Sequence, residues 1–166
     1  SHTIGVHYTV TNLAAEAAQL TPFVQLKRDS SPAPVASDAG MGMQPFLGSA
    51  LTQPDQRFTK FDFEDMAEDP FRADLTGGWI AMLQHYFVSA WGPDPDNTYR
   101  FRTRQTRSGD NIIGYTGPAM VITSGETTTI SNQLYVGPKN QPVLADLAKH
   151  LDLVVDYGWL WWIAQP

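Results

Sequence analysis

The chain has 166 residues, with 11 Lys and Arg against 17 Asp and Glu, so its formal net charge is −6, and it contains no cysteine. This length fits one domain with a hydrophobic core of its own. The acidic balance argues against nucleic-acid binding, and the lack of cysteine excludes disulfides, thiolate catalysis and cysteine-ligated zinc. No run of 18 apolar residues is present, so no segment is predicted to span a bilayer.

The first third of the chain is predicted to contain two strands and a long loop. Apolar residues alternate with small or polar ones at Ile4, Val6, Tyr8 and Val10. This period of two predicts a half-buried strand over Thr3 to Thr11. We expect a second strand from Leu20 to Arg28. Proline, serine and glycine without periodicity then predict a loop from Asp29 to Thr52.

Short strands dominate the rest of the sequence. We expect them near 58–63 and over Tyr99–Thr106, Asn111–Tyr115, Ala119–Thr123 and Thr127–Val136. Many short strands separated by turn residues indicate an antiparallel sandwich or barrel. Arg100, Arg102 and Arg104 alternate along one strand face. We interpret this charged face as the protection of an edge strand, or else as a surface that contacts an acidic partner.

Two segments need a choice between helix and strand. The spacing in Trp79 to Trp91 fits either a helical face or a strand buried on both faces, and the flanking glycines favour one long strand or two joined strands. A helix is predicted over about 142–152. Its apolar face would consist of Val143, Leu144, Leu147 and Leu151.

An uncharged aromatic segment follows this helix. It contains Tyr157, Trp159, Leu160, Trp161, Trp162 and Ile163. Indole rings favour the interface between membrane and water, so we expect this segment to lie at a membrane surface. The alternative is an aromatic cluster that folds back onto the sandwich.

No residue pattern predicts catalysis, a metal site or a cofactor. The four histidines are not placed at ligand spacing, and neither a nucleophile elbow nor a phosphate-binding loop occurs. The carboxylates from Asp62 to Asp69 lack the ordered ligands and glycine of a calcium loop, so we interpret them as solvated acidic turns. The chain is therefore predicted not to be an enzyme.

Three motifs carry a resemblance to a known family. The sequence G-G-W-I-A-M-L-Q-H-Y-F at 77–87, followed by Ala90-Trp91, resembles a motif of the bacterial YidC membrane protein insertases. L-Y-V-G-P-K at 134–139 is similar to a second motif of this family. The ending H-L-D-L-V-V-D-Y-G-W-L-W-W-I-A-Q-P at 150–166 resembles the link to the second transmembrane helix.

The resemblance implies the C-terminal part of the large first periplasmic domain of a Gram-negative member. The family fold is a mutarotase-like, antiparallel β-supersandwich with a C-terminal helix. Residues 1–156 would form part of this sandwich, and residues 157–166 an interfacial linker toward the second transmembrane helix. The expected location is the periplasmic face of the inner membrane.

The resemblance also implies a function for the parent protein. It would insert and fold inner-membrane proteins, alone or with the Sec translocase. The implied partners are SecF, SecD, SecYEG, nascent membrane proteins and the membrane surface near the C-terminus. From the resemblance, we expect the contact with SecF to involve residues 30–74. The domain itself would serve as a non-catalytic scaffold for interactions.

Two other functions stay open on the residues alone. A carbohydrate-binding or carbohydrate-active sandwich could use the rings of Trp79, Tyr86, Trp91 and Tyr99 as stacking platforms. An apolar cleft could instead bind unfolded or amphipathic segments of substrate proteins.

Overall fold

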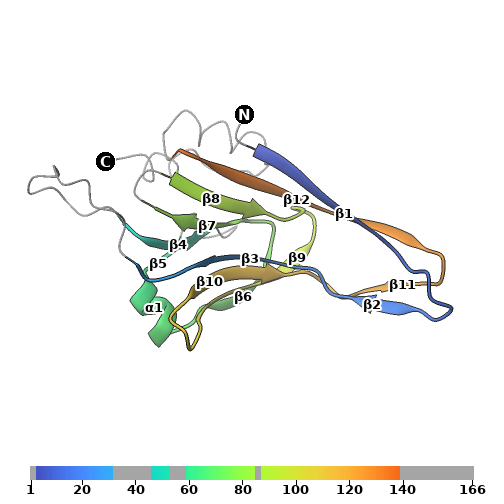
Figure 1. Ribbon diagram of the computed structural model, residues 1–166, viewed down its shortest axis with the longest axis horizontal. Coiled ribbons are helices and arrows are strands. Elements are labelled where there is room, and N and C mark those ends of the chain that lie inside the picture. The colour runs from blue at the N-terminus through green and yellow to red at the C-terminus, as the bar shows by residue number, and fades with distance from the viewer. Residues whose placement is uncertain (1–2, 32–45, 53–58, 85–86, 139–166) are drawn as a thin grey trace, which may run out of the picture.

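The computed structural model describes residues 3–31, 46–52, 59–84 and 87–138, and these residues form strands with one short helix (Figure 1). The strands of one sheet are β1 (Thr3–Thr11), β4 (Gly48–Leu51), β5 (Thr59–Phe61), β7 (Ile80–Leu83), β8 (Phe87–Gly92) and β12 (Thr127–Pro138). A second sheet contains β3 (Phe23–Arg28), β6 (Arg72–Thr76), β9 (Thr98–Gln105) and β10 (Asn111–Thr116). The remaining elements are β2 (Ala18–Leu20), β11 (Met120–Ile122) and the helix α1 (Phe63–Glu68).

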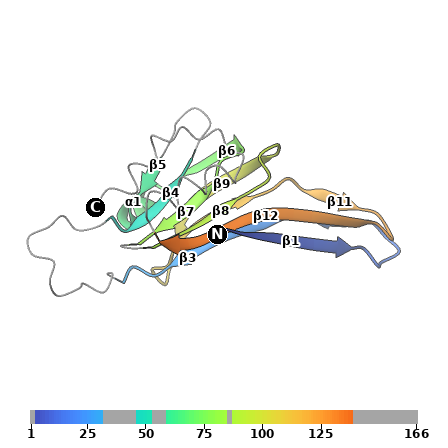
Figure 2. The ribbon, with the colours of Figure 1, turned by 90° about the horizontal axis from the view of Figure 1, so that it is seen from above.

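The two larger sheets face each other as a sandwich (Figures 1 and 2). One has the strand order β1-β12-β8-β7-β4-β5 and the other β3-β10-β9-β6, and every pairing is antiparallel. β2 and β11 form a separate two-stranded sheet. The predicted mainly β, antiparallel fold is therefore confirmed.

Apolar side chains fill the space between the sheets. The cluster includes Leu51, Ile80, Phe101 and Ile113, each at most 1% exposed, together with Met66 from α1. Burying one such side chain contributes about 1.5–3 kcal/mol. The body of the sandwich is thus held by apolar burial from both sheets and the helix.

The ambiguous segment from Trp79 to Trp91 forms two strands, β7 and β8, which pair with each other. Every residue of β7 is buried, so both faces of this strand are covered. A strand that is apolar on both faces has no period of two, and this explains why periodicity could not separate it from a helix.

The predicted strand near 58–63 is wrong at its end. β5 stops at Phe61, and α1 begins after Asp62, whose Oδ1 accepts a hydrogen bond of 2.8 Å from the Asp65 amide. This is a helix N-cap, so part of the acidic cluster forms a helix rather than a turn. β6 was not predicted from the sequence. The predicted strand from Leu20 to Arg28 divides into β2 and β3 at Thr21-Pro22.

Two predictions about strand environment also need correction. β9 is not an edge strand, because it lies between β10 and β6. β1 forms a strand over the predicted range, but Ile4 and Tyr8 are 53% and 56% exposed. β1 is the outermost strand of its sheet, and its outer part runs with β12 past the end of the second sheet (Figure 1).

Several predictions lie outside the described residues. These are the helix over 142–152 with Val143, Leu144, Leu147 and Leu151, the aromatic segment over 157–163, and most of the loop over 29–52. In the part of the chain that the structure describes, no helix has the length and apolarity needed to cross a membrane.

Candidate functional site

The paired strands β1 and β12 separate two hollows that are lined by different types of residue. Their register places Tyr8 opposite Ile130 and His7 opposite Ser131. Because side chains alternate along a strand, the apolar pair and the polar pair lie on opposite faces of the sheet. The face toward the second sheet borders an apolar groove, and the other face borders a polar pocket.

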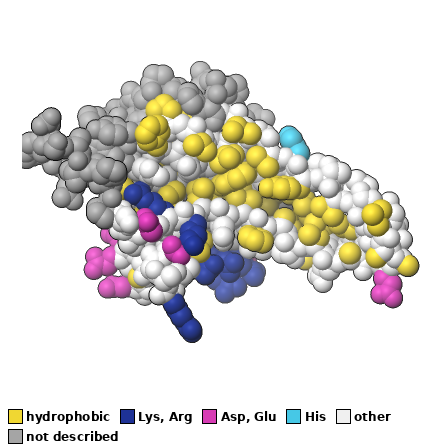
Figure 3. All heavy atoms as spheres, in the orientation of Figure 1, with side chains coloured by type: hydrophobic (Ala, Val, Ile, Leu, Met, Phe, Trp, Pro, Cys, Tyr) yellow, Lys and Arg dark blue, Asp and Glu magenta, His cyan; other side chains and the backbone are white. Residues whose placement is uncertain are grey.

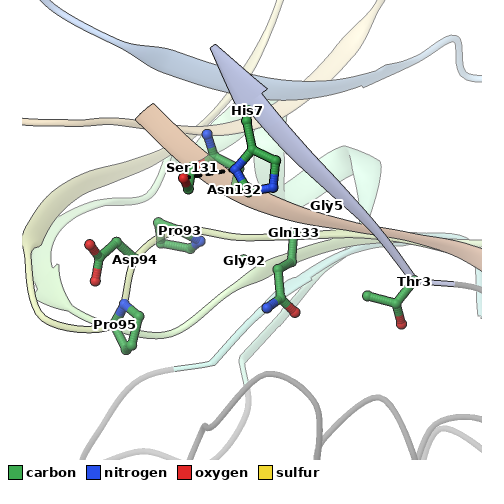
Figure 4. Close-up of a pocket in the computed structure, with 10 residues that line it drawn as sticks. All are labelled: Thr3, Gly5, His7, Gly92, Pro93, Asp94, Pro95, Ser131, Asn132 and Gln133. Atoms are coloured by element: carbon green, nitrogen blue, oxygen red, sulfur yellow. Dashed lines mark hydrogen bonds between the residues drawn. The ribbon is translucent and has the colours of Figure 1, made fainter. Parts of the chain in front are cut away.

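The polar pocket has a volume of about 470 Å³ (Figure 4). Its walls come from β1, β12, the end of β8 and the following loop, and they include His7, Pro93, Asp94, Pro95, Ser131 and Gln133. His7 Nδ1 lies 2.9 Å from Ser131 Oγ. Further along the strands, Thr11 and Thr127 continue this polar face with a 2.8 Å hydrogen bond between their hydroxyls.

The pocket does not assemble a catalytic triad. Asp94 Oδ1 accepts a hydrogen bond of 3.0 Å from the backbone amide of Asp96, and the imidazole of His7 contacts the serine instead. A nucleophilic serine needs its histidine oriented by a third group, and no such bond exists among the described residues. Within those residues, no three His, Cys, Asp or Glu side chains converge as metal ligands would.

The apolar groove lies between the β1–β12 pair and the second sheet, with a volume of about 280 Å³. Most of its lining is apolar or aromatic and includes Tyr8, Val10, Leu20, Tyr99, Tyr115 and Ile130. Figure 3 shows hydrophobic side chains along the same part of the molecule, from the body onto the projecting strands. The groove is therefore a surface for apolar groups that opens to solvent.

A hydrogen bond between the sheets fixes one end of this groove. The Tyr115 hydroxyl, on β10, donates to Asn132 Oδ1, on β12, over 2.8 Å, and both residues are buried. Burial raises the pKa of Tyr115, and burial together with the charge of Asp94 raises the pKa of Tyr99. Both phenols therefore stay neutral at physiological pH, and the Tyr115 hydroxyl acts as a hydrogen-bond donor.

Asn12 organises the tip of the projecting strands. Its side-chain amide donates to the carbonyls of Glu16 and Ile122, both at 2.8 Å, and accepts from the Ala14 amide at 3.0 Å. The side chain thereby ties the end of β1 to β11. This tip supports the outer part of the groove, where Leu20 and Val10 lie.

The sequence-predicted aromatic residues do not form one cleft. Trp79 is 1% exposed, so it cannot offer a ring face to a sugar, and that prediction is wrong for this residue. Trp91 is half-buried and packs against the core, and Tyr86 lies outside the described residues. Tyr99 does line a hollow, the apolar groove. Among the described residues, no Trp, Tyr or Phe lines the polar pocket, which is where polar groups converge.

The groove itself was missed by sequence reasoning. Its residues come from six separate strands and the turn after β2, so no local spacing joins them. The available signal was the alternation in β1, which was interpreted as an ordinary buried face. The exposed fraction of Tyr8 shows that part of this face is not covered by the second sheet.

Comparison with known proteins gives the family. The family model described as the YidC periplasmic domain matches residues 1–166. Over 158 residues the chain is 46% identical to the membrane protein insertase YidC of Marinomonas sp., a match that covers 95% of this chain and 28% of the relative. Identity to the protein of the same name is 40% in Aeromonas hydrophila, covering 99% of this chain and 30% of the relative. Identity is 39% to the protein of the same name in Pseudomonas aeruginosa, and this match covers 100% of this chain and 28% of the relative. The chain thus spans less than a third of the length of these relatives, and it belongs to the YidC periplasmic domain family.

Proposed function

We propose that the chain is a non-catalytic interaction domain of a membrane protein insertase and lies at the periplasmic face of the inner membrane. Support comes from the family match over the whole chain and from relatives that are named membrane protein insertases. The parent protein would insert and fold membrane proteins, alone or with SecF, SecD and SecYEG. The helix over 142–152 and the aromatic segment over 157–163 would couple the sandwich to the membrane surface.

Within this role, the apolar groove would hold apolar segments of nascent membrane proteins. The observation that carries this proposal is an open groove lined largely by apolar and aromatic side chains, beside strands with exposed apolar residues. An apolar segment of a nascent membrane protein exposes apolar surface to water while it is outside the bilayer. Burying that surface in the groove is favourable by about 25 cal/mol per Å². Neutral phenols along the groove would tolerate many sequences because they impose no charge requirement.

Peptide binding to paired variants tests the groove. Tyr8→Asp places a charge in the groove, whereas Ile4→Asp places the same charge four residues away on the same strand. The two wild-type side chains are 56% and 53% exposed, and Ile4 does not line the groove, so the variants are matched. We expect fluorescence anisotropy to show that a labelled apolar peptide binds the wild-type chain and Ile4→Asp and loses affinity for Tyr8→Asp.

Two results would count against the groove. Equal affinity for both variants would place peptide binding elsewhere on the chain. The second result combines two observations: removal of residues 159–162 abolishes peptide binding, and Tyr8→Asp binds the peptide as well as the wild type does. It would assign the binding to the aromatic segment instead. Circular dichroism of each variant establishes that the fold is intact before affinities are compared.

Contact with the Sec translocase needs a separate test. The region over 30–74 includes β4, β5, α1 and most of β6. We expect a photo-crosslinker on an exposed helix position, such as Glu64 or Glu68, to give SecF adducts in membranes. A crosslinker on Val121, 64% exposed on β11, serves as the control. Adducts only from position 121 would contradict this placement.

A further inference from the structure

The outer face of the second sheet carries an ordered array of basic side chains. Strand registers define three rows across β3, β10, β9 and β6. The first row is Phe23, Thr116, Arg100 and Asp74; the second is Gln25, Gly114, Arg102 and Arg72; the third is Lys27, Ile112 and Arg104. Val24 and Leu26 of β3 and Tyr99 and Phe101 of β9 pack into the core. The alternating residues in these rows therefore project away from it.

This face is positive on an acidic chain. Five of the 11 Lys and Arg residues lie on it, at Lys27, Arg72, Arg100, Arg102 and Arg104. Figure 3 shows basic side chains gathered on the side of the molecule where this sheet lies. Two carboxylates contact the array: Asp74 pairs with Arg100 and Asp110 with Lys27, each at 2.8 Å. The face thus keeps a net charge of +3, the five cations less these two carboxylates, although the chain carries −6.

The three remaining arginines lie close together, and Arg72 is also attracted by the Asp74 carboxylate. Arg72 and Arg102 are direct cross-strand neighbours, and Arg104 follows on the same face of β9. In the described residues, no carboxylate lies within ion-pair distance of Arg102 or Arg104. Like charges placed directly opposite each other on a sheet are destabilising, so this arrangement does not serve the stability of the fold.

We propose that the outer face of β3, β10, β9 and β6 docks on anionic phospholipid headgroups through Arg72, Arg102 and Arg104. Guanidinium groups bind phosphate oxygens through two parallel hydrogen bonds, and a row of them on a sheet matches a surface of repeated phosphates.

A lipid surface fits this face better than an acidic polypeptide. Phe23, 66% exposed, occupies the β3 end of the first row, where the basic face meets the apolar groove. Basic residues beside an exposed aromatic ring are typical of surfaces that bind membrane interfaces, since the ring enters the headgroup region while the cations stay at the phosphates. The relatives are named membrane protein insertases, and insertion takes place at a bilayer.

Vesicle binding tests this assignment with the 166-residue chain. Co-sedimentation is measured with vesicles of phosphatidylglycerol and phosphatidylcholine and with vesicles of phosphatidylcholine alone. We expect preferential binding to the anionic vesicles, weakened by salt. Because each basic residue near such a surface contributes about 1 kcal/mol, Arg102→Gln/Arg104→Gln should lower the partition coefficient about 30-fold.

Two further variants separate the effect of position from the effect of charge. Lys60→Gln/Arg107→Gln removes the same charge away from the three rows and should change binding much less. Arg102→Lys/Arg104→Lys keeps the charge, so an intermediate loss would identify phosphate binding by the guanidinium forks. The aromatic segment over 157–163 is identical in all variants, so its own lipid affinity does not alter the comparison.

Three outcomes would overturn the proposal. The first is equal binding to anionic and neutral vesicles, and the second is equal losses in the two charge-removing variants. The third is retention on immobilised polyglutamate with no preference for anionic vesicles, which would assign the face to an acidic polypeptide.

Discussion

The body of the sandwich and its projecting arm are stabilised in different ways. The arm comprises the outer ends of β1 and β12 together with β2 and β11 (Figure 1). In the body, Phe101, Ile113 and Met66 are fully buried between two sheets. In the arm, hydroxyl pairs and the Asn12 side chain join the strands, while Tyr8 and Val121 stay exposed. Apolar burial thus fixes the body, and hydrogen bonds hold an arm whose apolar side chains remain available to a partner.

The largest expected effect belongs to the body. Phe101→Ala removes a fully buried ring that contacts Tyr115, and we expect a loss of about 3–5 kcal/mol in the free energy of unfolding. Urea denaturation followed by tryptophan fluorescence measures it. The control, Val121→Ala on the arm, removes a side chain that is 64% exposed and should change stability by less than about 0.5 kcal/mol. Similar losses in both variants would contradict the division between body and arm.

Asn12→Ala should have a smaller and more local effect. It removes three hydrogen bonds at the arm tip and leaves the Ile122 carbonyl without its side-chain donor, at an expected loss of about 1–3 kcal/mol. Hydrogen exchange should accelerate at β2, β11 and the start of β12 and stay unchanged in β7. Uniform acceleration across both regions would show that the arm and the body unfold as one unit.

Tyr115→Phe tests the link between the two sheets. It keeps the ring but leaves Asn132 Oδ1 without the 2.8 Å hydrogen bond, so we expect a loss of about 1–2 kcal/mol. The double variant Tyr115→Phe/Asn132→Leu should recover part of this loss, because neither partner then remains as a buried unpaired polar group. If the single variant were as stable as wild type, the bond would not be a link between the sheets.

Acid should loosen the arm tip before the body. The backbone amide and then the hydroxyl of Thr123 bind the Glu126 carboxylate and hold its pKa below the ordinary value of 4.5. A carboxyl group with a lowered pKa in the folded state adds stability above its ordinary pKa, and this stability is lost as the pH falls through the lowered value. Hydrogen-exchange protection at the tip, corrected for the pH dependence of the intrinsic exchange rate, should therefore fall below about pH 4.5 in the wild type, and it should depend less on pH in Glu126→Gln. Identical profiles would remove Glu126 from this explanation.

The strand pattern was predictable where one face alone meets the core. The alternation in β9 predicted a strand close to the one observed, with every second residue from Tyr99 to Thr103 buried. Prediction failed where local sequence competes with the alternation, as at Asp62, whose cap starts α1 directly after β5. It also failed for strand order, which depends on pairings between distant segments such as β6 with β9.

The candidate site was less predictable than the fold. Aromatic residues were identified as binding groups by type, yet Trp79 is buried and Tyr99 lies beside Tyr115 in a groove built from distant strands. Sequence alternation shows which side chains share a face, but it does not show where the opposite sheet ends. That end point leaves Tyr8 exposed and creates the groove.

Photo-crosslinking in cells is a direct test of whether the apolar groove binds nascent membrane proteins. A photoreactive residue is placed at position 8, in the groove, or at position 4, on the same strand outside it, while a newly made membrane protein is labelled. We expect adducts with the nascent protein from position 8 and few from position 4. Equal adducts from both positions, or adducts from position 4 alone, would contradict a groove that binds apolar segments.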